Sequence, residues 1–242
     1  SDVCSSDLES VIVEKGDGLE AAARKARYTA LQKVAKERGA VAVLLGHTKD
    51  DQAETVLLGL ARGSGARSLS GMATVNGIYI RPFLEITRKE TEAACQELGL
   101  QPWQDPYNED LNFMRVRVRK KVLPMLESEL GPGISEALTR SAQLLRDDAD
   151  ALDELARAFW EEDQSLEVGA LLKLSRAVRT RVLRIALLKA IKDSGVNKGA
   201  AHLSSEQVSQ VEALVSNWKG QGEVSLPAGR SEEHTSELQS QS

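Results

Sequence analysis

One apolar run and the periodic segment after it organise the first half of the chain. Residues 41–45, Val-Ala-Val-Leu-Leu, contain no polar position, which is typical of a strand buried on both faces of a parallel sheet. After a polar turn that begins at Gly46, apolar residues recur with helical spacing at Ala53, Val56, Leu57 and Leu60. We expect this helix to end at Gly63, because glycine readily adopts the left-handed conformation that follows a helix C-terminus.

The same periodicity predicts more helix than strand. Helices are expected over residues 19–38, 87–98, 134–162, 171–192 and 204–214, and short strands over 11–13 and 77–82. Gly131-Pro132-Gly133 forms the clearest linker. The pattern therefore indicates two domains, an α/β domain over residues 11–130 and a mostly helical domain over 134–229.

The two ends of the chain do not share this pattern. Residues 1–10 and 230–242 are polar, serine-rich and aperiodic. They look like translated sequencing-adapter sequence and not like native protein, and ordinary disordered tails are the alternative. Both ends are left out of the fold prediction.

Composition narrows the function classes. The hydrophobic content of 41% and the charged content of 28% are ordinary for a globular protein, and a net charge of −5 means that nucleic-acid binding would need a local basic patch. The cysteines are Cys4 and Cys95, without a C-x-x-C motif, so we expect a reducing, cytoplasmic compartment and no thiolate metal site or iron–sulfur cluster. No apolar run approaches the roughly 18 residues of a membrane span, and no signal peptide is visible.

Two acids at the start of the central helix are the first candidate site. Asp51 and Glu54 are three residues apart and share one face of the first helical turn, beyond the carboxyl end of the predicted strand. Two carboxylates there could hold an ammonium group or a metal ion. The alternative is a capping role, because acids at a helix N-terminus are favoured by the helix dipole. Arg62 and the Gly63-Ser64-Gly65 turn lie at the other end, about 17 Å away by helical rise.

Clustered arginines are the second candidate site. Arg24 and Arg27 share a helix face and could meet phosphates. In residues 115–121, Arg-Val-Arg-Val-Arg-Lys-Lys, five of seven positions are basic, the best nucleic-acid patch of an acidic chain. For each cluster the alternative is a solvated, ion-paired surface.

The whole string from His47 to Gly65 resembles the tRNA(Ile)-lysidine synthetases of the PP-loop ATP-pyrophosphatase superfamily. Their family pattern has two motifs joined by an apolar stretch, H-x-x-D-D-Q-x-E-T and R-G-[ST]-G. This chain matches the pattern at His47, Asp50, Asp51, Gln52, Glu54, Thr55, Arg62, Gly63, Ser64 and Gly65. Residues 20–28 resemble the family's E-x-x-A-R-x-x-R-Y segment, and residues 105–126 resemble D-P-S-N, R-N-R-I-R and L-P-x-L, with Val116 in place of the asparagine. The resemblance implies an incomplete PP-loop domain, similar to the adenine nucleotide α-hydrolases, followed by a helical tRNA-binding domain.

The resemblance also implies a reaction. Such enzymes use ATP and Mg²⁺ to adenylate the wobble cytidine (position 34) of tRNA(Ile) with a CAU anticodon, and free lysine then displaces AMP to form lysidine. By analogy, Asp51 and Glu54 recognise lysine. His47, Arg24, Arg62 and the 63–65 turn serve the nucleotide or the activated cytidine. The tRNA contacts are expected from Arg27, Arg115, Arg117 and Arg119, and a homodimer is the open option for assembly.

One family element is absent from the sequence. The S-G-G-x-D-S loop that cradles the ATP phosphates does not occur, so we expect this polypeptide to bind ATP poorly and to be inactive by itself. Two rival functions stay open, a related PP-loop tRNA thiolase and a non-catalytic RNA-binding module. The thiolases usually carry paired cysteines for sulfur chemistry, which this chain lacks.

Overall fold

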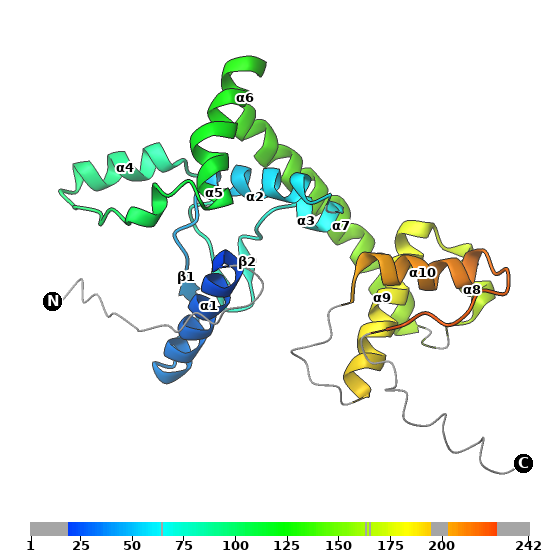
Figure 1. Ribbon diagram of the computed structural model, residues 1–242. Helices are drawn as coiled ribbons and strands as arrows, with labels where there is room; N and C mark the ends of the chain where they lie inside the picture. Colours follow the sequence, from blue (N-terminus) through cyan, green and yellow to red (C-terminus); the bar gives the residue numbers. More distant parts are fainter. Residues whose placement is uncertain (1–18, 64, 163, 165, 195–202, 227–242) are drawn as a thin grey trace, which may run out of the picture. The chain divides into compact units, whose positions relative to one another are not determined.

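The computed structural model divides the chain into two compact units, Ser1–Arg146 and Asp147–Ser242, which are described separately (Figure 1). The structure describes residues 19–63, 65–162, 164, 166–194 and 203–226. The predicted strand at 11–13 and the candidate Ser64 lie outside these residues. Within them, no helix is long and apolar enough to cross a membrane.

The first unit contains a small three-stranded sheet of order β1-β3-β2. β1 (Val43–Leu44) runs parallel to β3 (Tyr79–Ile80), with Val43 opposite Tyr79, and β2 (Val75–Asn76) pairs antiparallel with β3. The predicted parallel strand within 41–45 is confirmed, but it is shorter than expected, and its predicted burial on both faces is wrong. Leu44 of β1 is 68% exposed, and Val41, which precedes the strand, is 93% exposed.

In the described residues of the first unit, eight helical segments precede the long helix that begins at Ile134. Their bounds are α1 Leu19–Glu37, α2 Lys49–Ala61, α3 Ala66–Leu69, α4 Arg88–Glu97, the 3₁₀-helix η1 Pro106–Asn108, α5 Met114–Arg117, the π-helix η2 Val118–Val122 and α6 Leu123–Leu130. The predicted helices at 19–38 and 87–98 are confirmed. The predicted stop at Gly63 is also confirmed, since α2 ends at Ala61 and Gly63 has a φ of 65°.

The buried face of α2 differs from the predicted apolar stripe. Ala53 packs in a core with Val118 and Leu123, as expected, but Leu60 is 52% exposed. Asp51, Gln52 and Glu54 are buried instead. The periodicity fails because arginines from a distant segment neutralise the acids, so a polar face can be buried.

A proline explains the π-helix between α5 and α6. Pro124 has no N–H and cannot donate to the carbonyl of Lys120, where an α-helical bond would fall. The chain takes wider turns over η2 and resumes an α-helix at Leu123. Arg115 and Arg119 therefore lie on a locally irregular part of a nearly continuous helix.

In the described residues of the second unit, every regular element is a helix. α7 (Ile134–Glu162) passes from the first unit into the second and is followed by α8 (Val168–Lys173), α9 (Arg176–Asp193) and α10 (Ser205–Ser216). The predicted helix over 134–162 is confirmed, whereas the predicted helix over 171–192 is two helices, separated at Leu174 and Ser175.

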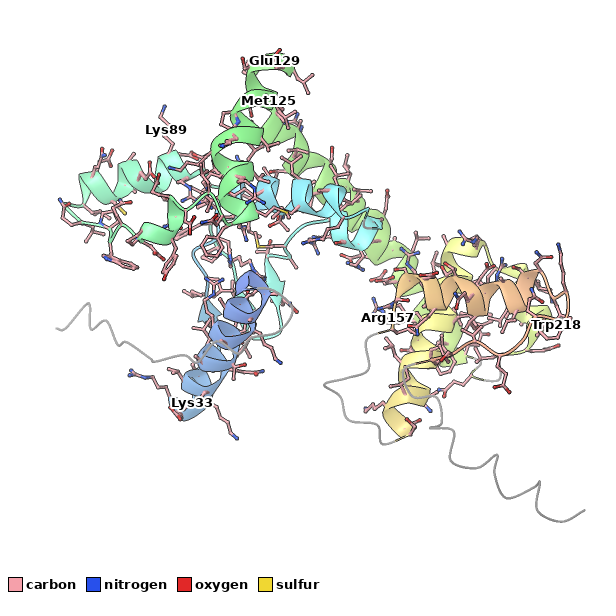
Figure 2. All side chains as sticks on the ribbon, in the orientation of Figure 1. Lys33, Lys89, Met125, Glu129, Arg157 and Trp218 are labelled. Carbon is pink, nitrogen blue, oxygen red and sulfur yellow. The ribbon has the colours of Figure 1, made fainter. Side chains whose placement is uncertain are left out.

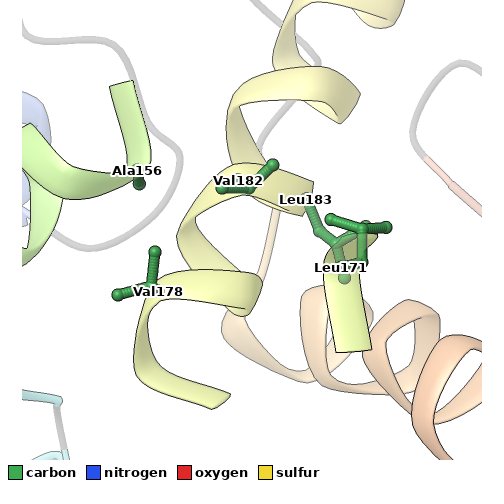
Figure 3. Close-up of a cluster of buried hydrophobic side chains, with 5 residues drawn as sticks. All are labelled: Ala156, Leu171, Val178, Val182 and Leu183. Carbon is green, nitrogen blue, oxygen red and sulfur yellow. The ribbon is translucent and has the colours of Figure 1, made fainter. Parts of the chain in front are cut away.

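The core of the second unit joins three of these helices. Its buried members are Ala156, Leu171, Val178, Val182 and Leu183 (Figure 3). The buried Arg179 donates to Glu212 over 2.6 and 2.9 Å and so ties α9 to α10. Some apolar side chains stay at the surface, such as Met125 of α6 in the first unit and Trp218 in the second, 53% and 64% exposed (Figure 2).

Candidate functional site

A pocket of about 350 Å³ lies in the first unit, at the carboxyl end of β1. It collects side chains from α1, the turn after β1, the first turn of α2, the start of α4, η1 and the α5–η2 segment. Its lining residues are Arg27, Tyr28, Leu31, Leu45, Gly46, His47, Asp51, Arg88, Asn108, Arg115 and Arg119. Four arginines and one carboxylate line this pocket, so it favours an anion.

Asp51 has two roles, one with each carboxylate oxygen. Its Oδ2 accepts hydrogen bonds from the backbone N–H and the hydroxyl of Thr48, at 2.9 and 3.0 Å, and thereby caps α2. Its Oδ1 lies 3.4–3.5 Å from nitrogens of Arg88, Arg115 and Arg119. Asp51 therefore takes the capping role, through its hydrogen bonds with Thr48, and it also lines the pocket.

Glu54 lies beneath the arginines. The residue is 0% exposed, and it accepts from Arg115 Nε at 2.7 Å and from Arg119 Nε at 2.5 Å. Arg119 adds a second bond of 3.1 Å, and Arg115 also donates to the backbone carbonyl of Asp51 at 3.0 Å. A buried carboxylate requires such compensation, because its desolvation costs several kcal/mol.

These contacts shift the ionisation of the site. Burial works to raise the pKa of Asp51, but the hydrogen bonds from Thr48 and the charges of Arg115 and Arg88 outweigh it and lower that pKa. Burial likewise works to lower the pKa of Arg119, but the hydrogen bond and charge of Glu54 raise it. Both shifts favour the charged forms of Asp51 and Arg119.

His47 is a titratable group of the pocket whose pKa is lowered. Burial, followed by the charges of Arg115, Arg81 and Arg24, outweighs the opposing effect of Asp51 and lowers the pKa of His47 to about 4. Its buried Nδ1 has no hydrogen-bond partner among the described residues. This atom is closed to solvent, so the residue lines the pocket with other atoms of its side chain or backbone.

Tyr28 supports the α1 side of the pocket. Its ring packs edge-on against Tyr79 with centroids 5.0 Å apart, and its hydroxyl accepts from Arg24 and from Arg81, each at 3.3 Å. Arg24 thus lies behind the pocket wall, with its guanidinium 4.9 Å from the Tyr28 ring centre. Arg27, one turn away, lines the pocket directly.

Sequence reasoning missed Arg88, Tyr28 and Asn108 as members of the site. Arg88 begins α4, next to the capping box formed by Thr87 and Glu90, and its local sequence predicts only a helix start. Its backbone N–H donates to Asp50 Oδ2 at 2.7 Å, which joins the starts of α4 and α2. Tyr28 and Asn108 could have been identified as site residues from the sequence, because both lie in the segments that resemble the family motifs.

Other predicted residues lie away from the pocket. Arg62 and the glycines Gly63 and Gly65 follow the far end of α2 and are exposed. Arg117 donates to the carbonyls of Leu111 and Asn112 and braces the preceding loop. The pocket therefore brings together His47, Asp51, Arg27, Arg115 and Arg119 from the predicted set, with Glu54 directly behind them.

The donor set fits phosphate oxygens better than a metal ion. Within the described ranges, no group of three His, Cys, Asp or Glu side chains is placed to hold a metal. The two nearest carboxylates already carry arginine partners. Mg²⁺ therefore does not fit these side chains, whereas guanidinium groups match the geometry of phosphate oxygens.

Comparison with known proteins matches both units. Residues 2–126 match the family model of the PP-loop domain, and residues 166–234 match that of the TilS substrate binding domain. A protein of Thermobifida fusca is 52% identical over 91% of this chain and 68% of its own length. A relative from Streptomyces coelicolor is 51% identical over 91% of this chain and 63% of its own length. One from Rhodococcus erythropolis is 48% identical over 92% of this chain and 66% of its own length. All three carry the name tRNA(Ile)-lysidine synthase, and the chain spans about two thirds of each.

Proposed function

Because this chain belongs to the tRNA(Ile)-lysidine synthase family, we propose that its pocket serves the ATP-dependent attachment of lysine to the wobble cytidine of tRNA(Ile). The predicted family and the PP-loop fold with a helical second part are confirmed by the matches. The observation that carries the proposal is the convergence of Asp51, His47 and the arginines Arg27, Arg88, Arg115 and Arg119 on one pocket inside the matched PP-loop domain.

The chemistry assigns work to each type of side chain. The cytidine O2 attacks the α-phosphate of ATP and pyrophosphate leaves. The lysine side-chain ammonium gives one proton to water, the neutral amine attacks C2, the C2–O2 bond breaks, AMP departs with that oxygen, and the attacking nitrogen loses a second proton. Negative charge is concentrated on phosphates throughout, so the four pocket arginines stabilise both steps.

Asp51 and Glu54 are the proposed partners of the lysine ammonium group. Asp51 Oδ1 faces the pocket, whereas Glu54 becomes accessible only if an arginine moves. His47 is proposed to contact the nucleotide or the cytidine, because the residue lines the pocket. No step is assigned to Mg²⁺, because the pocket's carboxylates are already paired with arginines.

The remaining contacts are proposed for tRNA(Ile) with a CAU anticodon in the cytoplasm. Arg27, Arg115 and Arg119 line the pocket and are proposed to contact the phosphate of an inserted nucleotide, and Arg117, which holds the adjoining loop, is proposed to contact the tRNA from there. Arg24, Arg62, Gly63, Ser64 and Gly65 remain proposed nucleotide-binding positions, and a homodimer remains a proposed assembly.

The test is transfer of labelled lysine to tRNA(Ile) transcripts. The sequence contains no S-G-G-x-D-S string, so we expect no transfer by the 242-residue chain and ATP-dependent transfer once such a segment precedes residue 11. A transcript with a GAU anticodon is the matched control. Failure of the extended protein to transfer lysine to the CAU transcript would refute the proposal.

A non-catalytic RNA-binding module is the second candidate, favoured by the arginine-rich pocket. It predicts salt-sensitive tRNA binding that Asp51→Ala does not change. The enzyme proposal predicts that Asp51→Ala abolishes lysine incorporation by the extended protein while it largely preserves tRNA affinity. The names of the relatives favour a lysine ligase over a tRNA thiolase.

A further inference from the structure

The acid pair, Asp51 and Glu54, already has cationic partners. Glu54 binds Arg115 and Arg119 through both of its oxygens, and Asp51 Oδ1 lies within 3.5 Å of three guanidinium groups. Two carboxylates are therefore surrounded by three arginines. An additional ammonium ion would meet an excess of positive charge there, which is repulsive at these distances.

The arginine pair, Arg115 and Arg119, covers the acids from the solvent side. The side chains of Arg115 and Arg119 are 24% and 21% exposed, whereas that of Glu54 is 0% exposed and that of Asp51 is 13% exposed. A ligand that reaches Glu54 must therefore displace these guanidinium groups. Both arginines also line the pocket, so they can meet a bound anion.

The backbone that carries the arginine pair is suited to a shift. Arg115 lies on the four-residue helix α5, and Arg119 lies on the π-helix η2. Pro124 prevents this segment from closing into one regular α-helix. Wide π-turns occur frequently at functional sites, where small rearrangements are tolerated.

We infer that Arg115 and Arg119 act as exchangeable counter-ions, which leave the acid pair for a substrate phosphate and so open the lysine site only after an anion has bound. This inference rests on the proposed function and specifies how that site is regulated. The displaced guanidiniums keep a charged partner, because the phosphate replaces the carboxylates. The lysine ammonium then replaces the guanidiniums at Asp51 and Glu54.

Such an exchange would set the order of the reaction. Lysine enters after a phosphate-bearing substrate, so its amine is excluded until the nucleotide is in place. Linkage requires that the anion strengthens lysine binding by the same factor as lysine strengthens anion binding. Couplings between sites are typically about 5- to 150-fold, and we expect about tenfold here.

The test measures binding of labelled lysine to the full 242-residue chain by equilibrium dialysis, at constant ionic strength. Three arms contain no added anion, inorganic pyrophosphate, or a tRNA(Ile) transcript. We expect the lysine Kd to fall about tenfold in at least one anion arm. A response to pyrophosphate identifies a site for ATP phosphates, and a response to tRNA alone identifies a site for the RNA backbone.

Variants test the role of the arginine pair. Replacing both with glutamine, Arg115→Gln with Arg119→Gln, should tighten lysine binding about tenfold without anion and abolish the anion effect. Lys121→Gln removes one charge from the same π-helix at an exposed position outside the pocket lining and should keep the wild-type response. If circular dichroism shows that the double variant is unfolded, the three wild-type arms decide the question alone.

The outcomes separate two failures. Lysine binding of equal strength in all three arms would overturn the coupling and leave the proposed lysine site intact. Absence of lysine binding in every arm would overturn the proposed function itself. A reciprocal tightening of tRNA binding by lysine, absent with norleucine, supports the exchange, because a purely structural ion pair would not produce it.

Discussion

Neutralising Glu54 should destabilise the first unit strongly. The substitution Glu54→Gln keeps the shape of the side chain but removes the charge that compensates Arg115 and Arg119 at 2.7 and 2.5 Å. Removing one partner of a buried ion pair costs roughly 3–5 kcal/mol. Because the two arginines retain partial exposure, we take the lower end, about 3 kcal/mol.

Hydrogen exchange measured by mass spectrometry suits this prediction, because each unit reports separately. Peptides from α2 should lose about 3 kcal/mol of protection, and a thermal transition of the first unit should fall by roughly 6–12 °C. The matched control is Asp153→Asn in the second unit, which removes a carboxylate bonded to Arg181 at 2.7 Å. Both members of that pair are partly exposed, so its loss should cost at most about 1 kcal/mol. Equal effects of the two substitutions would refute the compensation of Glu54 by the arginines.

Two further substitutions test the surroundings of the pocket. Gly71→Ala should lower the free energy of unfolding in urea by about 3 kcal/mol, because Gly71 has a φ of 65° and an added Cβ would lie 2.5 Å from Gln52 Oε1. The control is Gly77→Ala, which has a φ of 59° but open space around it and should lower that free energy by only about 1 kcal/mol. His47→Gln should flatten the loss of stability between pH 6.5 and pH 4, because the pKa of His47 is lowered to about 4 and the unfolded chain therefore takes up the proton first as the pH falls. An unchanged pH dependence of urea unfolding in that variant would show that His47 does not carry this effect.

The local features of the central segment could be predicted from the sequence. Glycine preference and helical spacing predicted the end of α2, and the three-residue separation of Asp51 and Glu54 predicted a shared helical face. The matched family strings pointed to Arg115 and Arg119 as functional side chains. These inferences depend on neighbours in the sequence or on an ordered set of residue types.

The pairing of these residues could not be predicted in the same way. Glu54 and Arg119 are separated by 65 positions, and periodicity carries no information about such contacts. The apolar stripe led to the wrong prediction for Leu60, because burial of the polar face of α2 depends on arginines from another segment. The run over 41–45 likewise predicted burial on both faces, but Val41 and Leu44 are exposed, because burial of a strand face depends on which distant segments pack on it.

The lysine KM of the Asp51→Asn variant tests the proposed site most directly. The measurement uses the protein that carries an S-G-G-x-D-S segment before residue 11, a CAU tRNA(Ile) transcript and saturating ATP. We predict that the lysine KM rises at least tenfold while the tRNA dissociation constant changes less than twofold, because Asp51 Oδ1 faces the pocket and the phosphate-binding arginines remain. A wild-type lysine KM in this variant would contradict the assignment of the pocket to lysine.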